Sequence, residues 1–129
     1  MSNKLDKILA EISAGELFDK ITILEIKKEK ISNNEKLVDV EKELSSLKNT
    51  VEKFIHNQSN ISKHVNELKE INLKLWDIED GKRAAEKEKK FDDKFIELAR
   101  NVYKLNDKRA KIKLAINTTL GSSIKEVKS

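Results

Sequence analysis

The sequence contains no cysteine and no proline, and only three of its 129 residues are glycine. Without cysteine there is no disulfide framework, no thiolate metal site and no cysteine nucleophile. Charged residues make up 39% of the chain and hydrophobic residues 37%, with Lys, Glu, Leu and Ile prominent. This mixture is typical of long helices, and the length favours a single domain spanning residues 1–129.

The patterns that would indicate a metal, a cofactor or a catalytic nucleophile are also missing. The two histidines, His56 and His64, lack the helical spacing of three or four that a metal pair requires. The Glu-x-x-His pattern of di-iron bundles, a glycine-rich phosphate loop and a nucleophile elbow are all absent. Asp92 and Asp93 are adjacent and so face different ways on a helix. We therefore expect no metal and no cofactor, and the residues specify no reaction.

Long hydrophobic runs are absent as well. Nowhere do about 18 apolar residues follow one another, which predicts no membrane span. The first fifteen residues lack the continuous apolar stretch of a secretory signal. The sequence thus predicts a cytoplasmic protein.

The formal net charge of +4 is concentrated near the C-terminus. From residue 99 onward there are 8 basic and 2 acidic side chains. Such a face attracts an anionic small molecule, nucleic acid or anionic lipid, whereas the alternative is that these cations complement a helix dipole. Nucleic acid is the least favoured partner, because arginine is scarce and acidic residues flank the region.

Apolar residues recur at steps of three and four along most of the chain, which is the stripe that a helix buries. We predict an all-α fold, an elongated antiparallel helical bundle or coiled-coil hairpin of three long helices plus a short N-terminal helix. The expected segments are a helical lead-in at 1–12, a helix at 14–32, a peripheral helix from Leu37 to Phe54, a helix from Ile61 or Ser62 to Lys90, a helix from Phe91 to Asn117, and a tail at 118–129.

The helix at 14–32 is apolar on more than one side. Ser13 and Glu16 form a capping box that begins it. Leu17 and Ile21 lie on one line, while Phe18 widens the apolar surface. Two interpretations fit this breadth: a central position in the bundle, or self-association through helix 14–32.

A second, polar stripe runs beside the apolar one on each of the last two helices. On one helix it comprises Asn72, Trp76, Glu79 and Arg83, and on the other Arg100, Tyr103, Asn106, Arg109, Lys113 and Asn117. An antiparallel hairpin brings the two stripes together. One interpretation is a structural network in which Glu79 or Asp80 pairs with Arg100 or Arg109. The other is an anion or sugar site, since arginine suits phosphate and carboxylate, and Trp and Tyr offer apolar faces with polar handles.

The first helix could contribute to this polar seam from a third side. Glu16, Asp19, Lys20 and Thr22 lie close together along it. The alternative is ordinary solvated surface charge beside a capping box.

Three stretches resemble a known family. GELFDKITILEIK, LWDIED and ARNVYKLNDKRAKIKLAIN fit the patterns GELxDKxTILxIK, LWxIED and ARxVYxxNDxRAxIKxxIN of a bacterial family of unknown function, DUF6165. The resemblance extends from about Glu11 to Ser129 and carries no activity. This sequence has Gly81 where the resemblance leads us to expect a bulkier residue. The motif letters coincide with the polar seam, and together with Arg83 they form the candidate ligand-binding set: Asp19, Lys20, Trp76, Glu79, Asp80, Arg83, Arg100, Tyr103, Asn106, Asp107, Arg109, Lys113 and Asn117.

Two functions follow from these patterns. The first is a helical binding or accessory protein, associated by analogy with glycosyltransferases or surface-polysaccharide assembly. The alternative is a small enzyme or sensor that binds a phosphorylated metabolite or nucleotide-sugar in the polar seam between the last two helices.

Overall fold

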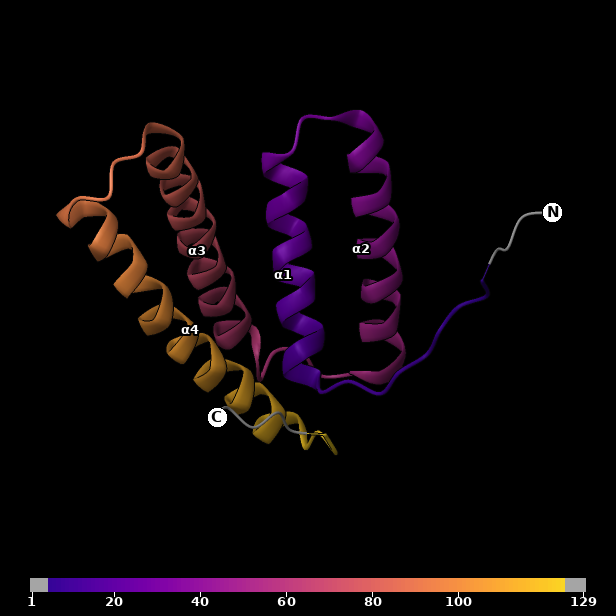
Figure 1. Ribbon diagram of the computed structural model, residues 1–129. Helices are drawn as coiled ribbons and strands as arrows, with labels where there is room; N and C mark the ends of the chain where they lie inside the picture. Colours follow the sequence, from indigo (N-terminus) through magenta and orange to yellow (C-terminus); the bar gives the residue numbers. More distant parts are fainter. Residues whose placement is uncertain (1–4, 125–129) are drawn as a thin grey trace.

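The computed structural model describes residues 5–124 and is all-α over that range, as the sequence predicted. Its helices are α1 (Ala14–Lys30), α2 (Asn34–Phe54), α3 (Ser62–Glu88) and α4 (Asp93–Leu120). They form two hairpins, α1 with α2 and α3 with α4, which lie side by side and meet along α1 (Figure 1). No disulfide or strand connects the described segments, so helix packing alone defines the fold.

Helix α1 lies at the centre, because it contacts each of the other three helices. It buries apolar side chains on several sides, among them Leu17, Phe18, Leu24 and Ile26. Of the two interpretations of this apolar breadth, a central position in the bundle is the one that the structure shows. Self-association through helix 14–32 stays a prediction.

The capping predicted for α1 forms in part as expected. The Ser13 hydroxyl accepts a hydrogen bond of 3.1 Å from the backbone N–H of Glu16. This bond satisfies one of the N–H groups that the first helical turn leaves without an intrahelical partner. The Glu16 carboxylate contacts Lys113 of α4, so the start of α1 is tied to α4 as well.

Helix α2 packs against α1 through a narrow apolar seam. Val40, Leu44 and Val51 are its buried residues, and polar residues cover its outer side. Helix α2 therefore has the peripheral position that the sequence predicted. Glu41 at its rim makes an exposed ion pair of 4.0 Å with Lys28.

Helices α3 and α4 are joined by a short turn and run in opposite directions (Figure 1). Lys89 ends α3 in the left-handed region at φ 57°, and the Asp92 side chain caps α4 by accepting from the N–H of Phe95 at 3.2 Å. The predicted hairpin is present, whereas its coiled-coil geometry stays a prediction.

Two of the predicted boundaries require correction. Residues 5–12 of the expected lead-in are not helical, and their apolar side chains are exposed. A helix this short needs packing to persist, and the segment packs against nothing along most of its length. The C-terminal boundary is also shifted, because α4 continues to Leu120 and ends at Gly121, so the tail begins later than residue 118. Leu120 packs against the core, which explains the extension. Positions 1–4 and 125–129 lie outside the described residues.

Candidate functional site

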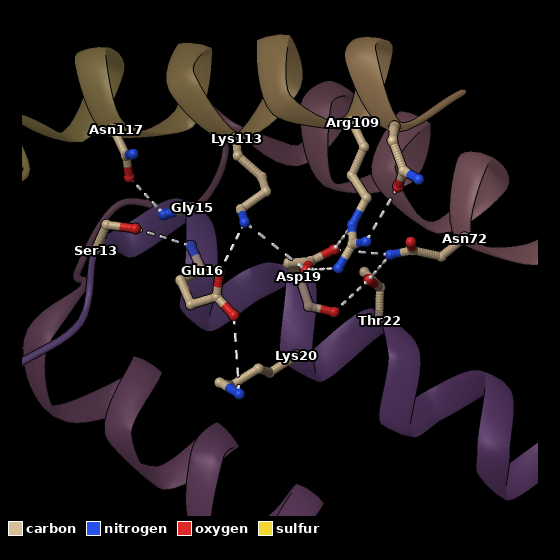
Figure 2. Close-up of polar contacts among 11 residues, drawn as sticks. Ser13, Gly15, Glu16, Asp19, Lys20, Thr22, Asn72, Arg109, Lys113 and Asn117 are labelled. Atoms are coloured by element: carbon tan, nitrogen blue, oxygen red, sulfur yellow. Dashed lines mark hydrogen bonds and ion pairs between the residues drawn. The ribbon is translucent and has the colours of Figure 1, made fainter. Parts of the chain in front are cut away.

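The polar side chains of the bundle converge on Asp19, a carboxylate of α1 whose side chain is only 1% exposed (Figure 2). Arg109 of α4 binds this carboxylate in a bidentate manner, with Nε donating to Oδ1 at 2.9 Å and Nη2 donating to Oδ2. Asn72 of α3 donates from Nδ2 to the same Oδ1 at 2.9 Å. A single buried carboxylate therefore joins three helices. The planar guanidinium suits this geometry, because its N–H groups match the spacing of two carboxylate oxygens.

A second ion pair lies one turn away from Arg109. Lys113 donates from Nζ to Glu16 Oε2 at 2.7 Å, and the same ammonium lies 4.0 Å from Asp19 Oδ2. Lys20 is exposed and reaches Glu16 at 3.8 Å. Charges of both signs therefore alternate across the contact between α1 and α4, as Figure 2 shows.

Hydroxyl and amide groups complete the cluster around Asp19. The Thr22 hydroxyl accepts from Asn72 Nδ2 at 3.0 Å and donates to the backbone carbonyl of Asp19 at 2.8 Å. Asn106 accepts from Arg109 Nη1 at 3.4 Å. Within residues 5–124, every buried side-chain nitrogen or oxygen has a hydrogen-bond partner. Such a satisfied network fixes how the α3–α4 hairpin sits on α1.

The backbones of α1 and α4 approach each other closely at Gly15. Its N–H donates to Asn117 Oδ1 at 2.6 Å, and the Asn117 side chain is buried. A Cβ atom on Gly15 would lie 2.5 Å from the backbone oxygen of Lys113. The absence of a side chain is therefore what allows the two helices to meet here.

Beside the polar cluster, an open groove of about 230 Å³ runs between α1 and α3. Its apolar part comes from both helices, with the Trp76 indole among the lining groups, and its polar part carries two carboxylates and two guanidinium groups. The lining residues are Ile23, Ile26, Asn72, Leu75, Trp76, Glu79, Asp80, Arg83 and Arg109. We call this feature the Trp76 groove. It combines an apolar wall with charged groups of both signs, which is the usual composition of a small-ligand site.

The charges of the Trp76 groove balance. Glu79 is exposed and pairs with Lys82 at 3.4 Å, while Asp80 and Arg83 are exposed at the rim. Arg109 has 28% of its side chain exposed, although its guanidinium is held by Asp19. The groove therefore has no excess of positive charge to concentrate an anion.

The structure divides the predicted site residues into three groups. Five of them line the Trp76 groove: Trp76, Glu79, Asp80, Arg83 and Arg109. Five others belong to the polar cluster around Asp19: Asp19, Lys113 and Asn117 contact the opposite helix, whereas Lys20 and Asn106 bind Glu16 and Arg109 of their own helices. The remaining three are exposed on α4 and line neither feature: Arg100, Tyr103 and Asp107.

Two predictions about this seam were wrong in their details. The polar stripe of α4 does not meet α3 along its whole length: Arg109 shares the Trp76 groove with α3, whereas Lys113 and Asn117 contact α1. The carboxylate that holds Arg109 is Asp19 of α1, while the ion pair of Glu79 is local to α3. The hypothesis that residues near Asp19 are ordinary surface charge fails for Asp19 and Thr22, which are buried.

Several residues that shape the site were not predicted to do so. Ile23, Ile26 and Leu75 form the apolar wall of the groove, and Gly15 permits the close helix contact. A glycine in the first turn of an otherwise good helix is the one available signal, because helices disfavour glycine unless close approach requires it. Ser122 accepts from the Ala14 N–H at 3.3 Å, and nothing in its local sequence marks that role.

The described residues contain no group of three or more His, Asp or Glu side chains that could hold a metal ion. Among the four helices of this range, none has an apolar stretch long enough to cross a bilayer.

Comparison with known proteins identifies one match. The sequence model of DUF6165, a family of unknown function, matches residues 8–129, which is essentially the whole chain. No curated protein and no solved structure matches the chain.

Proposed function

The chain belongs to the DUF6165 family, whose function is unknown, and we propose that it is a helical binding protein that takes a small ligand in the Trp76 groove. One observation carries this proposal: Trp76 shares an open cavity with two carboxylates and two guanidinium groups. The buried charges around Asp19 are engaged with one another and hold the helices in place. The adjacent Trp76 groove presents carboxylate and guanidinium groups at the surface.

The composition of the groove favours a neutral or zwitterionic ligand rich in hydroxyl groups. A hydroxyl both donates and accepts, so it can bridge the Asp80 carboxylate and the Arg83 guanidinium. The Trp76 ring offers an apolar face to the C–H groups of a sugar-like ring. At about 230 Å³ the cavity is smaller than the roughly 300–1,000 Å³ typical of sites for drug-sized molecules. A single ring with its substituents is the size that fits.

A phosphorylated metabolite or nucleotide-sugar is the second candidate, as ligand of a sensor or as substrate of a small enzyme. Two guanidinium groups, those of Arg83 and Arg109, line the groove and favour it. Glu79 and Asp80 oppose it, because carboxylates repel a phosphate at short range. A role beside glycosyltransferases or surface-polysaccharide assembly belongs to the same class of proposal, and sugars are the ligands that would support it.

Tryptophan fluorescence tests the proposal directly, because Trp76 is the only tryptophan of the chain. We expect a neutral or amino-bearing monosaccharide from a panel of sugars, sugar phosphates and nucleotide-sugars to change the emission in a saturable manner. Replacing Arg83 with alanine is expected to raise the Kd about tenfold or more, because a hydrogen bond to a charged group contributes about 1.5–3 kcal/mol.

Arg100→Ala is the matched control for that measurement. Arg100 is an exposed arginine on α4 that does not line the groove, so its removal is expected to leave the Kd unchanged. If no member of the panel changes the emission, the binding proposal fails. If only the phosphorylated members bind, and their affinity falls steeply with salt, the second candidate replaces the first.

A further inference from the structure

The segment that precedes α1 carries the most exposed large apolar side chains of the described chain. Leu5 is 80%, Ile8 81% and Leu9 90% exposed, and Ile12 is also exposed. Four such residues within eight positions form more than the scattered surface apolar residues that proteins normally tolerate. Figure 1 shows the segment leaving the start of α1, passing the adjacent end of α2 and extending away from the helices.

The spacing of these four residues is that of a helix face. Leu5, Ile8, Leu9 and Ile12 follow one another at steps of three, one and three, which places them on one side of a helix. In that conformation Asp6 and Glu11 flank the apolar side, one on each edge. The segment is not helical in the isolated chain, as expected for eight residues without a packing partner.

The same end of the bundle has an apolar cavity. It has a volume of about 460 Å³ and lies between the start of α1, the end of α2 and the residues after α4. Leu17, Phe54, Ile55 and Ile124 form its apolar wall, and Phe54 is 67% exposed. Of the segment, only residues 10–12 reach the cavity lining, so the three most exposed residues lie outside it.

One cation beside the cavity complements the acidic edges of the segment. Lys53 lies 5.3 Å above the centre of the Phe54 ring, beside the cavity wall. A helical segment with Asp6 and Glu11 on its edges would bring a carboxylate toward this cation. With Asp6, Glu11 and Lys7 the segment has two negative charges and one positive charge, a net −1, which does not favour an anionic lipid surface as the partner.

We propose that the occupant is a second copy of this chain, with residues 5–12 of each copy folding as a helix that places Leu5, Ile8 and Leu9 in the cavity of the other, while residues 10–12 stay in the wall of their own cavity. Residues 10–12 line a chain's own cavity while residues 5–9 lie outside it, and the Ser13 cap and the bond from the Ala14 N–H to Ser122 Oγ at 3.3 Å hold the chain where α1 begins. In a reciprocal exchange, the exposed segment of each chain fills the cavity of the other. Both the segment and the cavity are then covered, and the dimer is symmetric. This interface is separate from the Trp76 groove, so it does not depend on the proposed ligand.

Analytical ultracentrifugation of the full chain over a concentration series tests the proposal. We expect the wild type to reach twice the chain mass with rising concentration and its helical circular dichroism to increase in parallel. The variant Leu5→Ser/Ile8→Ser/Leu9→Ser is expected to raise the dimer Kd about a thousandfold or more, because each buried Leu or Ile contributes about tenfold or more. As a control for surface apolar residues in general, Ile96→Ser, on α4 and 52% exposed, is expected to leave the Kd unchanged.

Mixing two variants distinguishes this pairing from any other dimer. Phe54→Ser damages the cavity and leaves the segment intact, whereas the triple variant does the reverse. Each alone is expected to be monomeric, but a mixture retains one intact segment–cavity contact and so is expected to form mixed dimers. A wild-type chain that stays monomeric at high concentration overturns the proposal, whether its segment then proves to be folded onto its own cavity or bound to vesicles. A dimer that survives the triple substitution overturns it too.

Discussion

Replacing Asp19 with alanine is expected to lower the free energy of unfolding by about 3 kcal/mol or more, measured by urea denaturation followed by circular dichroism. The carboxylate is buried and accepts from Arg109 and Asn72 together, so its removal deprives α3 and α4 of their shared partner on α1. Removing one member of a buried ion pair leaves the other charge uncompensated, which is costlier than the pair is stabilising. The α3–α4 hairpin should lose its fixed placement on α1.

Two further variants define the cause of that loss. Glu86→Ala removes a carboxylate that pairs with Lys89 at 3.0 Å on the exposed end of α3, and the expected change is below about 1 kcal/mol. The double variant Asp19→Leu with Arg109→Met is expected to lose less stability than the sum of its single substitutions, because neither charge then remains without its partner. Equal losses for Asp19→Ala and Glu86→Ala would contradict the central role of Asp19.

Much of the fold could be predicted because its helices are long and strongly periodic. The narrow seam of Val40, Leu44 and Val51 indicates a helix packed on one side, and α2 is such a helix. The broad apolar surface of α1, with Phe18 beside the line of Leu17 and Ile21, indicates a helix with several neighbours. Residues 5–12 show the limit of this reasoning, because their spacing encodes a helix face while helix formation also depends on a packing partner.

The candidate site was predicted in part, and geometry explains both the success and the failure. On α3 the polar residues follow steps of four, three and four, which hold them on one face, and all of them line the Trp76 groove. On α4 the steps from Arg100 to Arg109 are all of three, so the stripe winds around the helix. These two arginines are nine positions apart, about two and a half turns at roughly 3.6 residues per turn, and therefore face opposite ways.

The partner of Arg109 could not be chosen from the sequence. Glu79, Asp80 and Asp19 are all carboxylates within helical segments, and local spacing does not rank them. The choice depends on how closely α1 and α4 approach, and that distance is set by a residue without a side chain, Gly15. The position of the polar network therefore follows from helix packing rather than from the pattern of polar residues.

Gly15→Ala is accordingly expected to destabilise the protein by about 1–3 kcal/mol, as overpacking of a close contact does. The added Cβ would lie 2.5 Å from the backbone oxygen of Lys113 and 3.0 Å from Asn117 Oδ1. Because the nearest atom belongs to the backbone, no side-chain rotation relieves the contact, and α1 must move away from α4. That movement would also weaken the pair between Lys113 and Glu16, so stability and the helix contact should be lost together.

The same substitution at Gly81 provides the matched control, because it is not expected to destabilise the protein. A Cβ there would meet the end of the Leu98 side chain at 3.1 Å, which can shift, and alanine is favoured over glycine in a helix by about 1 kcal/mol. Gly81→Ala is therefore expected to be neutral or to stabilise the protein by up to about 1 kcal/mol in the same urea titration. If Gly15→Ala proved as stable as Gly81→Ala, the contact between α1 and α4 at Gly15 would not be a close one. The position of the Asp19–Arg109 pair would then need another explanation.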